Sequence, residues 1–133
     1  MTQQNAKPAD GPKPARRRAR EAALQALYGW QVGSQDLAAC ETALHEVEGF
    51  NTLRNLEQNF AIGLLRGSIA QHETLREQLT PLLDRPFEEL SPVEACILLI
   101  GAYEMLAAVI NSTGLGLEPE AEMTLAEAKI HPA

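Results

Sequence analysis

The sequence is poor in the residues that build β-sheets and small disulfide-bonded domains. Its 133 residues include only 2 Cys, and aromatic residues make up 5% of the chain. Two cysteines are too few for a disulfide framework, and we expect Cys40 and Cys96 to be reduced thiols in the core. The 4 Val and 6 Ile are outnumbered by 20 Ala and 19 Leu, which favours helices because β-branched side chains lose rotamer freedom there. The composition therefore predicts an all-α fold, and the length predicts one domain.

The sequence also lacks the motifs that carry catalysis or metal binding. It has no glycine-rich phosphate loop, no nucleophile elbow, and no Cys or His residues at the spacing of metal ligands. We therefore predict that the protein is not an enzyme and has no catalytic residues, no metal site and no cofactor.

Segments that would direct the chain to a membrane are absent as well. No apolar stretch follows the charges at the N-terminus, so we expect no signal peptide. The longest apolar run, residues 95–110, is interrupted by Glu104 and is shorter than the roughly 20 residues that cross a bilayer. The sequence predicts a buried helix there, and a cytoplasmic protein without a membrane partner.

Hydrophobic periodicity and turn residues divide the chain into helices. Residues 1–14 contain 3 Pro and should form a disordered basic tail, whereas residues 15–133 should form a single compact helical bundle. Five main helices are expected, at about residues 15–32, 37–47, 53–69, 71–83 and 92–110. A short sixth helix, at about residues 119–130, needs to dock on the others to persist.

The apolar positions of the third and fourth helices predict part of the core. The inward-facing side chains should be Leu53, Leu56, Phe60 and Leu64 in the third helix, and Leu75, Leu79, Leu82 and Leu83 in the fourth. Gly67 followed by Ser68 suggests a bend near the end of the third helix.

The fifth helix has the clearest start signal in the sequence. Ser91 at the N-cap, Pro92 at the first helical position and Glu94 three residues after the cap form a capping box. The residues that follow are apolar nearly all round, so we expect other helices to cover most sides of this one. It should be the central helix of the bundle.

Charge is distributed unevenly along the chain. The net charge is −7, but residues 1–20 carry +5 and the remaining residues carry −12. A basic arm on an acidic body suggests a polyanion partner at one end and a basic partner elsewhere. The plainer interpretation is a solvated arm that only aids solubility.

A helical wheel places part of this arm on one flank, beside the buried face. Arg17, Arg18, Gln25 and Tyr28 share the flank. In single-stranded RNA recognition, guanidinium groups contact phosphates, amides contact base edges and aromatic rings stack on bases. The predicted RNA-binding residues are Arg16, Arg17, Arg18, Arg20, Gln25 and Tyr28. The alternative is that Tyr28 is a rim residue of the core and that the arginines are merely solvated.

A second candidate surface is acidic. Glu88, Glu89 and Glu94 cluster around the connector before the fifth helix and at the start of that helix. Their charge predicts a binding site for a basic protein partner. The alternative is a solvated acidic turn, because exposed ion pairs are often worth little.

Two blocks of the sequence resemble one known family. The first block is ARRRARE at residues 15–21, followed by QALY at 25–28 and WQ at 30–31. The second is PLLDR at residues 81–85 and SPVE at 91–94, continuing to LIGAYE at 99–104. In this order they resemble the NusB family of bacterial transcription antitermination factors, over about residues 15–106. Residues 107–133 diverge, since they lack the Val-Asn-Gly motif of the family.

The resemblance implies a fold and partners. It implies an all-helical domain that pairs with NusE, a protein of the small ribosomal subunit, and together with NusE binds the boxA element of nascent RNA. It also implies action on the transcription elongation complex, chiefly on ribosomal RNA operons.

Three functions are compatible with these residues. The first is an RNA-binding antitermination factor, and the second is a protein-interaction module or a decayed paralogue with little RNA affinity. The third is the accessory RNA-binding domain of an rRNA methyltransferase, although this chain contains no methyltransferase domain. The divergent C-terminus adds a structural expectation: either Met123, Leu125 and Ile130 dock a short helix on the central helix, or two chains cover it as a homodimer.

Overall fold

The computed structural model describes residues 13–113 of the chain, and these residues form an all-α structure, as predicted from composition. Five α-helices lie in this part: α1 (Ala15–Gly33), α2 (Leu37–His45), α3 (Asn55–Ala70), α4 (His72–Leu79) and α5 (Pro92–Thr113). Three short 3-10 turns connect them: η2 (Phe50–Thr52), η3 (Thr80–Leu82) and η4 (Phe87–Glu89). Most of the predicted basic tail and the predicted helix at residues 119–130 lie outside the described residues.

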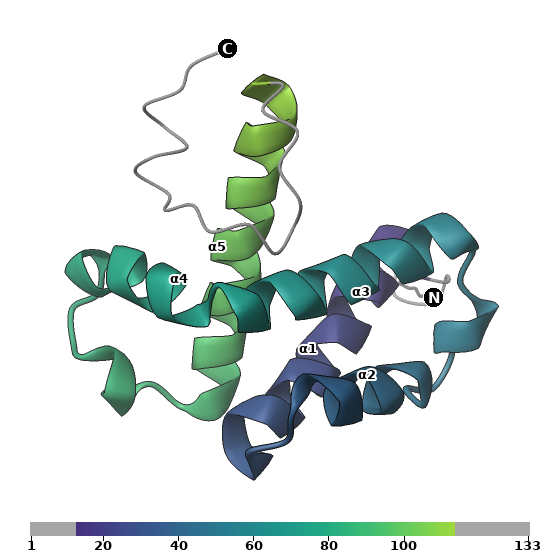
Figure 1. Ribbon diagram of the computed structural model, residues 1–133, viewed down its shortest axis with the longest axis horizontal. Helices are drawn as coiled ribbons and strands as arrows, with labels where there is room; N and C mark the ends of the chain where they lie inside the picture. Colours follow the sequence, from purple (N-terminus) through teal and green to yellow (C-terminus); the bar gives the residue numbers. More distant parts are fainter. Residues whose placement is uncertain (1–12, 114–133) are drawn as a thin grey trace, which may run out of the picture.

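The helices are arranged around α1 and α5. Figure 1 shows α3 and α4 end to end across the molecule, with α5 crossing them and α1 and α2 below α3. α1 packs against α2, α3 and α5, while α5 also packs against α3 and α4. Because α1 packs against α2 and α3 as well as α5, side chains on different sides of α1 face different helices.

Two helix starts carry side-chain caps, and one of them is the capping box predicted from the sequence. The Asp36 carboxylate accepts a hydrogen bond of 2.9 Å from the backbone N–H of Ala39 at the start of α2. At the start of α5, the Glu94 N–H donates to Ser91 Oγ at 3.1 Å and the Ser91 N–H donates to Glu94 Oε1 at 2.9 Å. The capping box is therefore confirmed.

The third and fourth helices are shorter than predicted, which changes the core. The turn η2 and an extended Leu53 precede α3, so the helix begins at Asn55 rather than near Leu53. Leu53 and Leu64 are buried as expected, but Leu56 is 69% exposed. Similarly, α4 gives way to η3 at Thr80, and Leu82 in that turn is 77% exposed. The prediction that Leu56 and Leu82 face inward was wrong. Leu82 lies in a 3-10 turn, where α-helical spacing does not apply. Leu56 lies in the first turn of α3, about 80° around the helix from the buried Leu64.

The expected bend at Gly67 does not occur. α3 runs through Gly67 and Ser68 to Ala70, and both residues are buried. Gly67 is placed where the ring of Tyr103 on α5 packs directly against the helix backbone. Because Gly67 has no side chain, α3 and α5 can pack closely at this point, and the glycine does not interrupt α3.

The two cysteines are buried free thiols, as predicted. Burial raises the pKa of the Cys96 thiol to about 11. Burial also raises the pKa of Cys40, and the nearby charge of Asp36 adds to this effect. Both thiols are therefore poor nucleophiles near neutral pH.

α5 is a core helix that is only partly covered. Its inner side packs against α1, α3 and α4, and carries buried residues such as Cys96, Leu99 and Leu106. By length and composition alone residues 92–110 are apolar enough to cross a membrane, a segment longer than the run of residues 95–110 considered in the sequence. This is weak evidence for a membrane span, because the core helices of bundles have the same composition.

Candidate nucleic-acid interface

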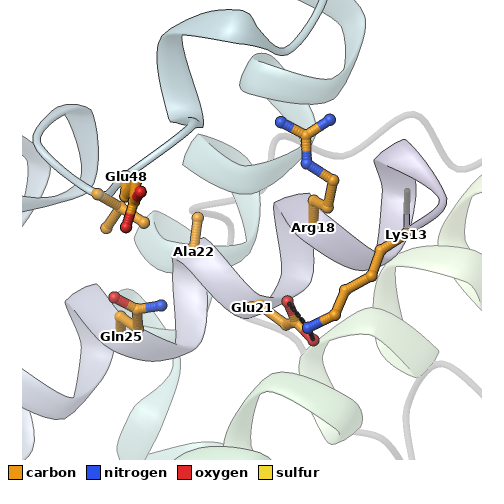
Figure 2. A pocket seen from close by; sticks show the side chains of 7 residues that line it. Lys13, Arg18, Glu21, Ala22, Gln25 and Glu48 are labelled. Atoms are coloured by element: carbon orange, nitrogen blue, oxygen red, sulfur yellow. Dashed lines mark hydrogen bonds and ion pairs between the residues drawn. The ribbon is translucent and has the colours of Figure 1, made fainter. Parts of the chain in front are cut away.

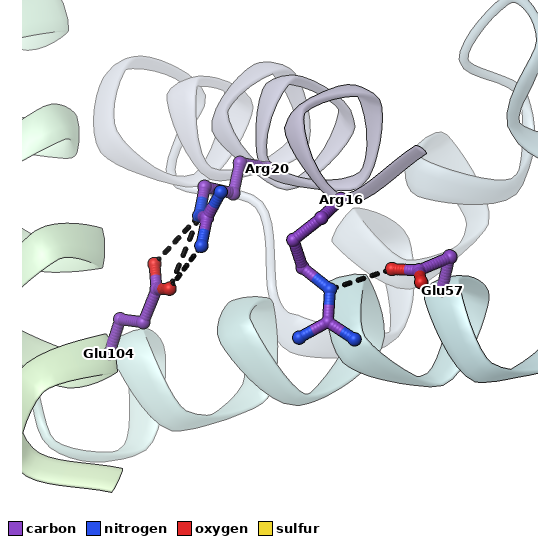
Figure 3. A network of polar contacts seen from close by, with 4 residues as sticks. All are labelled: Arg16, Arg20, Glu57 and Glu104. Carbon is purple, nitrogen blue, oxygen red and sulfur yellow. Dashed lines mark hydrogen bonds and ion pairs between the residues drawn. The ribbon is translucent and has the colours of Figure 1, made fainter. Parts of the chain in front are cut away.

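Two of the four candidate arginines form ion pairs with other helices. Arg16 Nε donates to Glu57 Oε1 on α3 at 2.7 Å, and its guanidinium lies 3.9 Å from the ring centroid of Phe60. Arg20, one turn further along α1, reaches Glu104 on α5. Figure 3 shows the two ion pairs side by side on α1, directed to different helices. These arginines therefore help hold the bundle together.

The pair of Arg20 and Glu104 has bidentate geometry. Arg20 Nε donates to Glu104 Oε1 at 2.9 Å, and Arg20 Nη2 donates to Oε2 at 2.6 Å. The hydrogen bonds from Arg20 hold the pKa of the Glu104 carboxyl below its ordinary value. The side chains remain 44% and 31% exposed, so solvent screens much of the attraction.

We expect Glu104→Gln to lower the free energy of unfolding by about 0.5–1 kcal/mol at pH 7. A carboxyl whose pKa is lower in the folded protein contributes stability above its unfolded pKa of about 4.3, and loses this contribution as the pH falls through the folded value. The difference between parent and variant should therefore shrink below about pH 4. Urea unfolding at a series of pH values measures it. The control is Glu89→Gln, since Glu89 is exposed and makes no ion pair within residues 13–113. A difference that persists unchanged to low pH would contradict this role of the ion pair.

Arg18 turns away from the other arginines, toward the connection between α2 and α3. Its Nη2 donates to the Gly49 carbonyl at 3.2 Å and to Thr52 Oγ1 at 2.7 Å. Gly49 has a φ of 84°, in the left-handed region that favours glycine, and this conformation helps place its carbonyl oxygen. The helical wheel put Arg18 on one flank with Tyr28, but in the structure the Arg18 guanidinium is bonded to a loop.

Arg17 is the most exposed of the four arginines. Its side chain is 62% exposed, and it makes one long contact of 3.4 Å with Glu21, four residues later on the same helix. Lys13 also donates to Glu21, at 3.1 Å, and this hydrogen bond is the main cause that lowers the pKa of the Glu21 carboxyl. Arg17 is thus the candidate arginine that a phosphate reaches with the least competition.

Gln25 and Tyr28 lie together on the side of α1 that faces the start of α5. With Leu24 and Val93 they line an open hollow of about 450 Å³, and Tyr28 is 42% exposed. A second open hollow, of about 300 Å³, continues along α1 between Leu24 and Ile97, with Arg17 and Arg20 at its edge. We call these two hollows together the α1/α5 groove. It brings Arg17, Arg20, Gln25 and Tyr28 to one side of the protein.

Gln25 also borders a polar pocket on the neighbouring side of α1. This pocket has a volume of about 320 Å³, and Arg18, Lys13, Glu21 and Glu48 line it. In Figure 2, Lys13 reaches down to Glu21, while Gln25 and Glu48 lie together away from Arg18. Lys13, Glu21 and Glu48 were not among the predicted site residues. Lys13 could have been found from the sequence, because it lies just before the first helix. Glu48 could not, because only the fold brings it to this pocket.

The three acidic candidates have different surroundings. Arg76 forms an ion pair with Glu88, and Arg85 lies 3.2 Å from Glu94. Glu94 also accepts the backbone N–H of Ser91, and this bond is the main cause of its lowered pKa. Within residues 13–113, Glu89 makes no ion pair. The predicted acidic cluster is thus partly neutralised by neighbouring arginines and partly used to cap α5.

Comparison with known proteins matches the greater part of the chain. The model of the NusB family matches residues 17–112. The chain is 55% identical over 95 residues to the transcription antitermination protein NusB of Dechloromonas aromatica, covering 71% of this chain and 56% of the relative. It is 50% identical over 111 residues to the protein of the same name from Ralstonia nicotianae, covering 82% and 70%. The chain thus spans little more than half the length of the first relative. Comparison with solved structures gives no significant match. From the family match and these identities we conclude that the chain belongs to the NusB family.

Proposed function

We propose that the protein is a transcription antitermination factor that binds single-stranded RNA of the boxA type along the α1/α5 groove and pairs with NusE. The relatives are named as transcription antitermination proteins, and this supports the general activity. The observation that carries the RNA site is the exposure of Arg17, Gln25 and Tyr28 on one side of α1. Such a protein acts on the elongation complex in the bacterial cytoplasm.

The residues along the groove supply the interactions that single-stranded RNA needs. The guanidinium of Arg17 binds a phosphate, the amide of Gln25 hydrogen-bonds a base edge, and the ring of Tyr28 stacks on a base. Gln25 and Tyr28 are three residues apart on α1, and are therefore neighbours on the helix surface. Arg20 takes part only if a phosphate competes with Glu104 for its guanidinium.

The ion pairs set the expected strength of the electrostatic contribution. If all four arginines neutralised phosphates, the logarithm of affinity would fall with the logarithm of salt concentration at a slope of roughly −3. If Arg16 and Arg20 stay with their carboxylates, the slope is roughly −1.4. The structure favours the smaller value, because Arg16 and Arg20 already have partners at 2.7 and 2.6 Å.

We expect Arg17→Ala to weaken binding of boxA-type RNA and to make the salt slope shallower by about 0.7, the contribution of one phosphate contact. Titration of labelled RNA at several salt concentrations, with and without NusE, measures both effects. The matched control is Arg66→Ala, which removes the same charge from α3, where Arg66 pairs with Glu41. A flat salt dependence, or equal binding by both variants, would show that the basic arm does not take part in RNA binding. It would favour the alternative function, a protein-interaction module with little RNA affinity.

The same proposal places NusE at the acidic surface of Glu88, Glu89 and Glu94. The net charge of −12 over residues 21–133 favours association with a basic protein. Since Arg76 and Arg85 already neutralise two of these acids, Glu89 is the residue most available to a basic partner.

A further inference from the structure

Glu21 lies on α1 between the α1/α5 groove and the polar pocket, and it borders both. Two cations reach its carboxylate from the N-terminal side, Lys13 and Arg17. Arg17 and Glu21 are four residues apart on the helix, and are therefore neighbours on its surface. A negative charge thus lies beside the arginine that is most exposed to a phosphate.

The two cations hold Glu21 with different strength. Lys13 Nζ donates to both carboxylate oxygens at 3.1 Å, and in Figure 2 its side chain runs along α1 to Glu21. Arg17 Nε donates to Oε2 at 3.4 Å, which is longer than the roughly 2.7–2.9 Å of a strong charge-assisted hydrogen bond. On a helix, an acid that follows its cation by four residues also makes a weaker pair than one that precedes it. Lys13 is therefore the principal partner of Glu21.

The choice of partner decides where a positive charge is left over. Lys13, Arg17 and Glu21 carry two positive charges and one negative charge, so one positive charge stays uncompensated. When Glu21 pairs with Lys13, this charge is on Arg17 at the edge of the groove. When Glu21 pairs with Arg17, it is on Lys13, which lines the polar pocket instead.

We propose that Lys13 is a positioning residue for RNA binding: it holds the carboxylate of Glu21, and thereby leaves the guanidinium of Arg17 to a phosphate. This inference rests on the proposed function, because it concerns the arginine that binds RNA at the groove. Glu21 then acts as a competitor of the RNA phosphate, and Lys13 weakens that competition.

The competition follows from the chemistry of the guanidinium group. Carboxylate and phosphate bind the same N–H donors of an arginine, so Arg17 has to leave Glu21 before it pairs fully with a phosphate. The side chains of Lys13 and Glu21 are 52% and 37% exposed, and solvent therefore limits the strength of each pair. Exposed ion pairs of this kind change an equilibrium by up to about fivefold.

Binding of labelled boxA-type RNA by four proteins at low salt tests the proposal. The proteins are the full chain, Lys13→Gln, Glu21→Gln and the double variant. We expect Lys13→Gln to weaken binding about two- to fivefold more in the parent background than in the Glu21→Gln background. The direct attraction between Lys13 and RNA is lost in both backgrounds, whereas Glu21 turns to Arg17 in the first alone. Lys13→Arg keeps a cation at this position and should bind RNA as the parent does.

The outcomes of this cycle separate three roles of Lys13. Equal effects in the two backgrounds overturn the proposal, because Lys13 would then act through its own charge alone. A larger effect in the Glu21→Gln background also overturns it, and shows that Lys13 itself binds a phosphate once Glu21 releases it.

The matched control for Glu21→Gln is Glu41→Gln. It removes the same charge from α2, where Glu41 pairs with Arg66. The effect of Lys13→Gln should be the same with and without Glu41→Gln. If Glu41→Gln reduced that effect as much as Glu21→Gln does, the coupling would come from net charge, and the proposal would be overturned.

An NMR measurement without RNA gives an independent readout. We expect the Arg17 Nε–H to exchange with water about two- to fivefold more slowly in Lys13→Gln than in the parent, because Glu21 then accepts its hydrogen bond. The Arg16 Nε–H, which is bonded to Glu57, should exchange equally in both proteins. Unchanged exchange at Arg17 overturns the proposal. If the parent binds no RNA, the proposed function fails, and this measurement still decides whether Lys13 keeps Glu21 from Arg17.

Discussion

Replacing Gly67 by Ala should lower the free energy of unfolding by about 2 kcal/mol, although Ala is the better helix former. A Cβ at this position would overlap Cζ, Cε1 and Cε2 of Tyr103, whose side chain is only 5% exposed. The buried ring has little room to move, so the substitution forces α3 and α5 apart or the ring into a strained rotamer. Thermal or urea unfolding measures the loss.

The matched control lies one turn earlier on the same helix. Gly63 is also inside α3, but an added Cβ there would meet no atom within 4 Å. Gly63→Ala should therefore raise stability by roughly 0.5–1 kcal/mol, because it reduces the entropy that the unfolded chain loses on folding. The changes in the free energy of unfolding should therefore have opposite signs for Gly67→Ala and Gly63→Ala. If both substitutions were stabilising, Tyr103 would not pack on Gly67 as described.

The sequence predicted those parts of the fold that depend on neighbouring residues. α1 was expected at residues 15–32 and is found at Ala15–Gly33, because apolar spacing and the following turn residues are local signals. The capping box at Ser91 and Glu94 was predicted for the same reason. Gly67 shows the limit of such reasoning. A glycine next to a serine is locally typical of a bend, and only the position of Tyr103 on another helix gives its role.

The candidate site was predictable in composition but not in geometry. A helical wheel gives the angle of each arginine around α1, and it placed Gln25 and Tyr28 on one flank. A wheel of α1 cannot show contacts with Glu57 and Glu104, because these residues lie 41 and 84 positions from their arginine partners along the chain. It cannot show Gly49 either, whose carbonyl oxygen accepts a hydrogen bond from Arg18. The direction of a long side chain depends on partners that the fold supplies. Three of the four arginines therefore point to three different parts of the structure, and Arg17 contacts only its own helix.

The inward face of α3 gives the second large expected effect. The sequence pattern assigned Leu56 and Leu64 to the same buried stripe, whereas their exposed fractions are 69% and 3%. Leu64→Ala should cost about 2–5 kcal/mol, since it removes methyl groups from a packed core and leaves a cavity. For a domain whose total stability is about 5–15 kcal/mol, such a loss is a large part of the whole.

Leu56→Ala is the matched control, because it makes the same chemical change two turns earlier on the same helix. We expect it to change stability by less than about 0.5 kcal/mol, as is usual for exposed positions. Urea unfolding of both variants gives the comparison, and equal slopes with denaturant show that both unfold from equally compact states. A loss of similar size at the two positions would mean that Leu56, like Leu64, lies in the core. The small loss at Leu56 is expected because this residue lies in the first turn of α3, about 80° around the helix from Leu64, and its side chain is largely in solvent.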